Sequence, residues 1–132
     1  MTSDRRQSAV YGTRSEELLG FSRAVRHGEV ICVSGTTADL SGVDPADDNA
    51  GSQARQILTR IQLLLEELGA DFENVIRSRI YLTNMDDLSA VAEAHAESFG
   101  GVRPATTVVQ VAALAAPRLL VEMEVDAWCS KR

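Results

Sequence analysis

The residues of this sequence with the clearest capacity for chemistry are three carboxylates near its C-terminal end, Glu122, Glu124 and Asp126. They alternate with apolar residues in the two-residue rhythm of a β-strand, so all three are predicted to share one face. At a rise of about 3.3 Å per residue, neighbouring carboxylates lie roughly 7 Å apart. Such a row repels itself unless cations or solvent oppose it. A member of the row that is shielded from water would have the raised pKa that suits a general base.

A second predicted strand, 75–82, supplies cations that can oppose this row. Its polar face is expected to carry Arg77, Arg79 and Tyr81, and its apolar face Ile76, Ile80 and Leu82. One interpretation of the combined polar surface is a solvated outer face. The other is a surface that packs its charges against copies of itself, in a closed ring. We favour the ring, and we expect Thr106, Val108, Gln110 and Trp128 on the same uncovered face.

Length and composition predict one domain over residues 1–132, with a frayed polar N-terminus at 1–6. The 13 basic and 19 acidic residues give a net charge of −6, which disfavours a nucleic-acid partner on electrostatic grounds. No apolar run reaches the roughly 18 residues of a membrane span, and no signal peptide is visible. The sequence therefore predicts a cytoplasmic protein without a membrane partner.

The cysteines and histidines fit no metal-ligand spacing. Cys32 and Cys129 are far apart, as are His27 and His95, so we expect neither a metal nor a cofactor. Cys32 lies in the apolar run 30–33 and is expected to be a small core residue. His95 is expected to be half-buried on the apolar stripe of a helix rather than catalytic.

The elements that must position these residues follow from hydrophobic periodicity. Strands are predicted at 7–12, 21–26, 30–34 and 75–82, with two more in the last thirty residues; 16–20 is expected to be a turn and 39–49 a surface loop. Two amphipathic helices are expected: a long one that Gly69 closes and a shorter one that ends at Gly100. The order predicts an α+β fold in which two helices cover one face of a sheet of four to six strands.

Several stretches, in this order and spacing, resemble the YjgF/RidA (reactive intermediate deaminase; endoribonuclease L-PSP-like) family. They are 20–25, 33–35, the long helix, 75–82, 103–111 and 121–124, and the similarity covers residues 15–128. The resemblance implies a chorismate-mutase-like fold with a mixed β-sheet of about six strands, assembled as a homotrimer around a central barrel. Small-molecule ligands would bind in the clefts between subunits. Better-known members hydrolyse enamines and imines such as 2-aminoacrylate to 2-oxo acids and ammonia.

The resemblance also implies roles for particular residues. Glu122 matches the catalytic position that orients water. The positions expected to bind ligand are Phe21, Arg23, Gly35, Arg103, Thr106, Thr107 and Val108. Those expected to pair charges structurally at the subunit interface are Arg77, Arg79, Glu124 and Asp126.

One departure from the family pattern affects the expected substrate. The Arg that binds the substrate carboxylate aligns with Thr106, which has no guanidinium group. Arg23 or Arg103 is a possible substitute. Alternatively, the pocket takes a less acidic ligand that Thr106 and Thr107 bind through their hydroxyls.

Three functions stay open at this stage. The first is hydrolysis of an enamine, imine or related C–N bond by a water that Glu122 holds. The second is a ligand-binding or regulatory trimer without turnover. The third is the endoribonuclease or translation-inhibitor activity in the family's name, which the acidic composition disfavours.

Overall fold

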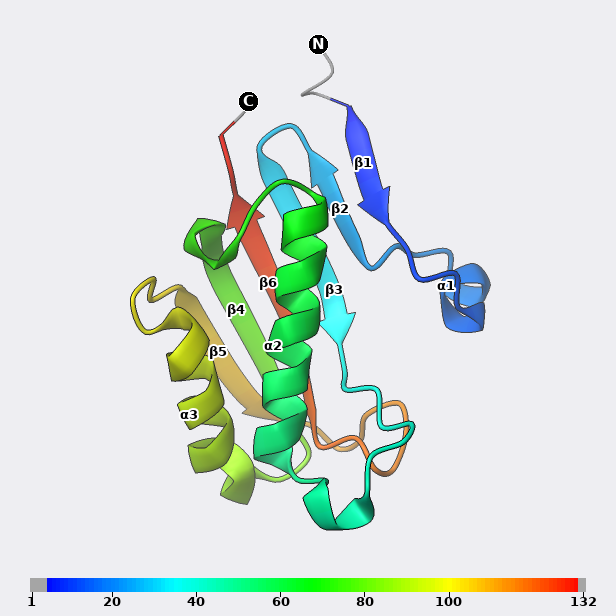
Figure 1. Ribbon diagram of the computed structural model, residues 1–132, viewed down its shortest axis with the longest axis vertical. Helices are drawn as coiled ribbons and strands as arrows, with labels where there is room; N and C mark the ends of the chain where they lie inside the picture. The colour runs from blue at the N-terminus through cyan, green and yellow to red at the C-terminus, as the bar shows by residue number, and fades with distance from the viewer. Residues whose placement is uncertain (1–4, 131–132) are drawn as a thin grey trace.

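The computed structural model describes residues 5–130 as a twisted six-stranded sheet with two helices laid across one face (Figure 1). The strands are β1 (Arg6–Ala9), β2 (Ala24–His27), β3 (Val30–Thr36), β4 (Val75–Leu82), β5 (Ala105–Gln110) and β6 (Val121–Trp128). The helices are α1 (Arg14–Leu19), α2 (Ala50–Glu67) and α3 (Leu88–Phe99). Short 3-10 turns precede α2, β4 and α3. Residues 1–4 of the expected frayed N-terminus lie outside the described residues, and Arg6 already belongs to β1.

The strand order across the sheet is β1-β2-β3-β6-β4-β5, so the last strand of the chain lies inside the sheet. All neighbouring pairs are antiparallel except β4 and β5, which are parallel and joined by α3. The predicted α+β fold, with a mixed six-stranded sheet and two helices on one face, is confirmed. Within the described range, no helix combines the length and apolar character needed to cross a membrane.

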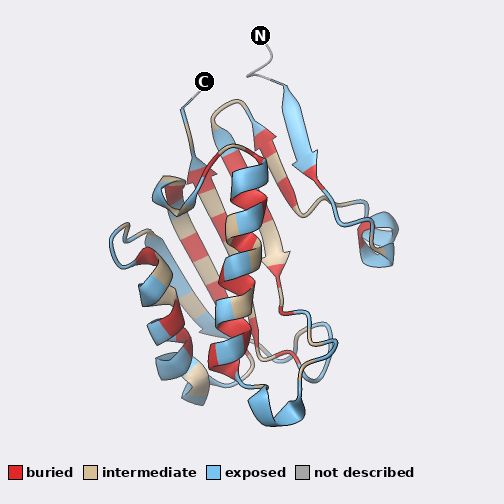
Figure 2. Cartoon of the chain, in the orientation of Figure 1, coloured by how far each residue is buried: buried red, intermediate tan, exposed pale blue. Residues whose placement is uncertain are grey.

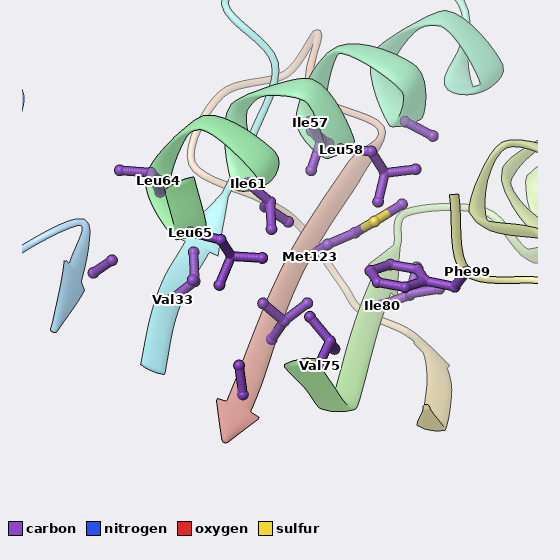
Figure 3. Close-up of a cluster of buried hydrophobic side chains, with 14 of the residues drawn as sticks. Val33, Ile57, Leu58, Ile61, Leu64, Leu65, Val75, Ile80, Phe99 and Met123 are labelled. Carbon is purple, nitrogen blue, oxygen red and sulfur yellow. The ribbon is translucent and has the colours of Figure 1, made fainter. Parts of the chain in front are cut away.

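The core lies between α2 and the sheet, as the buried stripes of Figure 2 show. Helix α2 begins at its cap Asn49, whose side chain accepts a hydrogen bond from the Ser52 N–H. Its buried side chains meet those of β6 and neighbouring strands (Figure 3). The closely packed set includes Ile57, Ile61, Leu65, Phe99, Val121, Met123 and Val125. This layer holds β6 rigidly, and β6 carries the carboxylate row on its opposite face.

Helix α1 replaces the turn that the sequence predicted at 16–20. Thr13 caps it, and the Glu16 side chain accepts hydrogen bonds from the Thr13 N–H, at 2.6 Å, and from the Tyr11 N–H, at 2.8 Å. Gly20 ends the helix in the left-handed conformation, with φ 72°. The prediction was wrong because six residues are too few to show an apolar stripe, and Leu18 and Leu19 are exposed.

A β-bulge in β4 overturns the expected position of Ile76. Val75 lies opposite Ala127 and Arg77 lies opposite Asp126. The chain therefore advances two residues along β4 while it advances one residue along β6. The extra residue, Ile76, turns outward and is 57% exposed. Val75 takes the buried position instead, and the predicted face of Arg77, Arg79 and Tyr81 is kept.

Two further predictions about sheet faces were wrong. In the parallel pair, Ser78 lies beside Thr106 and Ile80 beside Val108, so Thr106 and Val108 face α3 rather than the open face. Gln110 lies beside the buried Leu82, so it too is on the helix side of the sheet, like Thr106 and Val108. Cys32 is exposed on the open face, because its neighbours Ile31 and Val33 both point into the core.

Candidate functional site

The carboxylate row lies where the sequence predicted it, on the face of β6 that no helix covers. Glu122, Glu124 and Asp126 are half-buried, and the residues that alternate with them are fully buried against α2. Because β6 is flanked by β3 and β4, the row runs along the middle of the open face. The carboxylates are therefore partly screened from water by the side chains of the two flanking strands.

Side chains of β4 satisfy two of the three carboxylates through diagonal contacts. Arg79 lies directly opposite Glu124 but forms its ion pair one pleat further on, with Asp126, at 3.2 Å. Tyr81 lies opposite Glu122 but donates its hydroxyl proton to Glu124. Each contact is offset in the same direction along β6, so the offset leaves Glu122 at the end of the row without a partner from β4. Within residues 5–130, Glu122 forms no ion pair.

The unpartnered position perturbs the acidity of Glu122. Burial is the main cause, and the negative charge of Glu124 adds to it; together they raise the pKa of Glu122 above its ordinary value of 4.5. The hydrogen bond to Glu124 likewise raises the pKa of Tyr81, which keeps that hydroxyl protonated and able to donate. A carboxylate with a raised pKa and a free oxygen can accept a proton from water.

Gly35 provides the space that the Glu122 carboxylate occupies. The β3–β6 register shifts between Val33 and Thr36, which brings the backbone of Gly35 close to the Glu122 side chain. A Cβ on Gly35 would lie 2.0 Å from Oε2 of Glu122. Any larger residue at 35 must displace the carboxylate, so Gly35 and Glu122 form one local unit.

Phe21 and Arg23 form a separate cluster beside β3. The Arg23 guanidinium lies 4.9 Å from the centre of the Phe21 ring and 5.2 Å from that of Tyr11. Its Nε lies 3.3 Å from a carboxylate oxygen of the buried Glu16. The cluster is tied to β3 because the Ser34 N–H donates to the carbonyl of Arg23 at 2.8 Å.

Glu16 is the member of this cluster that sequence reasoning missed. Although burial alone would raise the pKa of Glu16, the hydrogen bonds from Tyr11 and Thr13 and the charge of Arg23 lower it to about 2. The signal was present in the sequence, since Thr13 and Glu16 have the spacing of a helix capping box. With Glu16 as its partner, Arg23 is held by the chain itself.

The remaining predicted ligand-binding residues lie on the edge strand β5 or just before it. Thr107 lies beside Arg79 on the open face, whereas Val108 packs against the core. Arg103 is exposed, and Thr106 donates its hydroxyl proton to the carbonyl of Pro104 at 2.9 Å. Strand β4 separates β5 from β6, and Thr106 lies level with Val125 rather than with Glu122, because Ser78 pairs with both Thr106 and Val125. Thr106 is therefore two strands across and three residues along the sheet from Glu122, and it lies on the opposite face.

A single chain therefore does not gather the predicted residues into one pocket. It forms three groups: Glu122 with Gly35, Phe21 with Arg23, and Arg103 with Thr106. Of the residues predicted to pair charges, Arg79 and Asp126 form an ion pair, Glu124 bonds Tyr81, and Arg77 forms no ion pair within residues 5–130. In the same range, no three His, Cys, Asp or Glu side chains gather as a metal site would require.

Comparison with known proteins identifies the family. The model of the family described as endoribonuclease L-PSP matches residues 13–129. Among solved structures, a member of the YjgF/YER057c/UK114 family from Mycobacterium tuberculosis superimposes with a TM-score of 0.86 at 41% identity, covering 94% of this chain and 99% of that one.

Two sequence relatives add to this match. An uncharacterized protein of Streptomyces coelicolor is 35% identical over 128 residues, covering 97% of this chain and 96% of its own length. A 2-iminobutanoate/2-iminopropanoate deaminase of Capra hircus is 34% identical over 99 residues, covering 71% of this chain and 69% of the relative. With the sheet order and helix placement described above, these matches show that the chain belongs to the endoribonuclease L-PSP family, the YjgF/RidA group of proteins.

Proposed function

We propose that this protein hydrolyses an enamine, an imine or a related C–N bond of a small molecule, with Glu122 holding the water that attacks. One observation carries the proposal. The Glu122 carboxylate is half-buried, lies against the bare backbone of Gly35, and has no cationic partner in the described part of the chain. The raised pKa brings this carboxylate closer to the range in which a general base works well. Relatives named as imine deaminases support the reaction class.

The chemistry needs only proton transfers and one water. Water adds to the carbon of the C=N bond while Glu122 takes a proton from it. The proton then passes to the nitrogen, which gives an amine and a hydroxyl on the same carbon. The hydroxyl proton next moves to the nitrogen, and ammonia leaves as the carbonyl forms. An enamine first gains a proton at carbon and loses one from nitrogen, which converts it to the imine. The sum is imine plus water to carbonyl plus ammonia, without oxidation or reduction.

We further propose that the protein acts as a homotrimer whose ligand lies in the clefts between copies. The three groups of predicted site residues are separated within one chain, so a cleft that uses more than one group needs a second copy. The open face of the sheet carries both signs of charge, including Arg77 and Glu122, which residues 5–130 leave without an ion pair. An uncovered face of mixed charge is typical of a subunit interface.

The second candidate is a ligand-binding trimer without turnover. The residues that would hold a substrate carboxylate favour this candidate, because both are already engaged. Thr106 donates its hydroxyl proton to the carbonyl of Pro104, and Arg23 forms an ion pair with Glu16. Neither offers a free cation beside Glu122. The endoribonuclease of the family's description is a weaker candidate, because a net charge of −6 opposes binding to a phosphate backbone.

The decisive experiment measures the release of ammonia and 2-oxo acid from freshly generated 2-aminoacrylate. Wild type is compared with Glu122→Gln, which keeps the shape of the side chain, and with Thr106→Arg. Loss of activity in Glu122→Gln, and a wild-type rate that falls in acid as Glu122 becomes protonated, would support the hydrolase. Activity that appears only in Thr106→Arg would mean that wild type acts on a different substrate. No release by any of the three would favour the ligand-binding trimer.

A further inference from the structure

Glu124 is the carboxylate next to Glu122 on the open face of the sheet, and the proposed hydrolysis gives it no task. The two side chains leave β6 two residues apart, so their attachment points on the backbone lie roughly 7 Å from each other. Two carboxyl groups this close titrate as a pair, because each ionised group disfavours ionisation of the other. Their neighbours on β3 and β4 therefore decide which of the two takes up a proton first.

The cation nearest to Glu124 in the strand register does not bind it. Arg79 lies directly opposite Glu124, but its guanidinium turns to Asp126, at 3.2 Å. Tyr81 binds Glu124 instead, and its hydroxyl donates to Oε1. Within residues 5–130, this is the only hydrogen bond or ion pair of the Glu124 side chain. Glu124 thus has a neutral donor where the register would allow a cation.

A neutral donor and a cation have opposite effects on the neighbouring Glu122. A guanidinium would bind the Glu124 carboxylate and also cancel much of its field. A phenolic hydroxyl stabilises the carboxylate and leaves its negative charge in place. That charge acts on Glu122, whose pKa is raised first by burial and second by Glu124. The bond to Glu124 also raises the pKa of Tyr81, so the hydroxyl stays protonated at neutral pH.

Few other charged groups face Glu122 in the described part of the chain. Strand β3 presents the backbone of Gly35 to it. Strand β5 contributes Thr107 and Val109 to the open face, and neither side chain titrates. Helices α2 and α3 cover the opposite face of the sheet (Figure 1). The other titratable or charged residues of the open face between β3 and β4 lie further along the strands: Cys32, Arg77, Arg79 and Asp126. Glu124 is therefore the charge that acts most directly on Glu122.

We propose that Tyr81 is a positioning residue for the Glu122 base. By donating to Glu124 it holds a negative charge beside Glu122, so that Glu122, rather than Glu124, receives the proton taken from water. Tyr81 acts through Glu124 and does not itself bind substrate. This role rests on the proposed hydrolysis, whereas the order in which the two carboxylates take up a proton can be measured without turnover.

The first test follows the Glu122 carboxyl by ¹³C NMR titration of the full-length protein, with Glu122→Gln to assign its signal. In wild type, Glu122 should titrate above pH 4.5. Glu124→Gln removes the neighbouring charge and should lower the midpoint by roughly one pH unit, as expected for a charge about 7 Å away in a half-buried site. Tyr81→Phe keeps the aromatic ring and removes only the hydroxyl. It should lower the midpoint too, because the released Glu124 either takes up a proton itself or turns to Arg79.

A double variant tests whether Tyr81 acts through Glu124. Once Glu124→Gln is present, Tyr81→Phe has no charge left to hold and should shift the Glu122 midpoint no further. Glu67→Gln, at an exposed carboxylate of α2 on the other side of the sheet, is the matched control and should leave the midpoint unchanged. Thermal unfolding of each variant shows whether the fold is kept.

The second test reads the same effect in the pH dependence of ammonia release from 2-aminoacrylate. In Tyr81→Phe and in Glu124→Gln, the fall of the rate in acid should move to lower pH together with the NMR midpoint. The rate at neutral pH should decrease by less than about tenfold, because Glu122 stays in place as a weaker base. A purely structural Tyr81 would lower the rate at every pH without moving its fall in acid.

Two results would overturn the role of Tyr81. An unchanged Glu122 midpoint in Tyr81→Phe would show that the hydroxyl does not hold the charge of Glu124. Equal shifts from Tyr81→Phe with and without Glu124→Gln would show that it acts by another route. A wild type that releases no ammonia, but whose Glu122 midpoint shifts as expected in the variants, would count against the hydrolysis while supporting the order of proton uptake.

Discussion

Replacing Gly35 with alanine is expected to move the Glu122 carboxylate while leaving the fold intact. The new Cβ would lie 2.0 Å from Oε2 of Glu122, 3.0 Å from Cδ and 3.5 Å from Cγ. Van der Waals contact requires about 3.5 Å, so the oxygen must retreat by about 1.5 Å. The three nearest atoms all belong to the flexible Glu122 side chain, and none is backbone.

The cost of this substitution should therefore appear in function rather than in stability. Turning a side chain away from its preferred rotamer costs about 0.5–1.5 kcal/mol, which is small beside the roughly 5–15 kcal/mol that stabilises a typical domain. A displacement of about 1 Å at a reacting group can reduce a rate on the order of 100-fold. We expect a loss of that size in imine hydrolysis by Gly35→Ala.

The assay pairs ammonia release with thermal unfolding. Gly101→Ala is the matched control, because a Cβ at that position meets nothing within 4 Å. A double variant sharpens the test: in Glu122→Asp the shorter carboxylate withdraws from residue 35, so adding Gly35→Ala should cost much less in that background.

A measurement of the Glu122 pKa tests the same contact without turnover. Carboxyl ¹³C titration should show Glu122 titrating above 4.5 in wild type, because burial raises its pKa. In Gly35→Ala the displaced carboxylate is better hydrated, so its pKa should fall toward the ordinary value. An unchanged pKa with an unchanged rate would refute the reasoning, as would a loss of several kcal/mol of stability.

Three further predictions concern the free energy of unfolding, measured with urea. Glu122→Gln should raise it at pH 7, because the raised pKa means that folding disfavours the charged form; the gain should vanish in acid, where wild type is protonated. Lower stability at pH 7 would contradict this. The pKa of Glu16 is lowered to about 2, so the stabilisation that ionised Glu16 gives the folded state is present above pH 4.5 and is lost as the pH falls toward 2. Glu16→Gln should remove that part of the dependence of stability on acid pH. Gln53→Leu should cost about 2 kcal/mol, since the Leu120 N–H and the Arg118 carbonyl each lose a buried partner; a neutral effect would show that water replaces the amide.

The sequence predicts most of the fold because its long elements have clear periods. The stripe that includes Ile57, Ile61 and Leu65 defines α2, and the alternation around Met123 defines β6. The position of Glu122 on the open face follows directly from that alternation. Where one period runs through a whole element, the buried face can be predicted from the sequence.

The failures occur where one extra residue or one strand pairing decides the face. The bulge at Ile76 adds a residue that periodicity does not reveal, and it turns an isoleucine out to solvent. The face of Thr106 depends on its pairing with Ser78, a contact between segments that α3 separates. Local sequence carries no information on such a register. For the same reason, the sequence did not show that Thr106 and Glu122 lie on opposite faces.

The central position of β6 in the sheet has a consequence for how the chain folds while it is being synthesised. During synthesis, strands β1 to β3 and the pair β4–β5 emerge as two separate pieces of sheet, since only β6 hydrogen-bonds to both β3 and β4. Until residues 121–128 leave the ribosome, the centre of the apolar face of α2 has no strand to pack against. The edges of β3 and β4 that β6 later pairs with also stay open to other chains. The strand that carries Glu122 is therefore also the one that closes the fold. A premature stop just before it would yield an aggregation-prone chain rather than a slightly shortened protein.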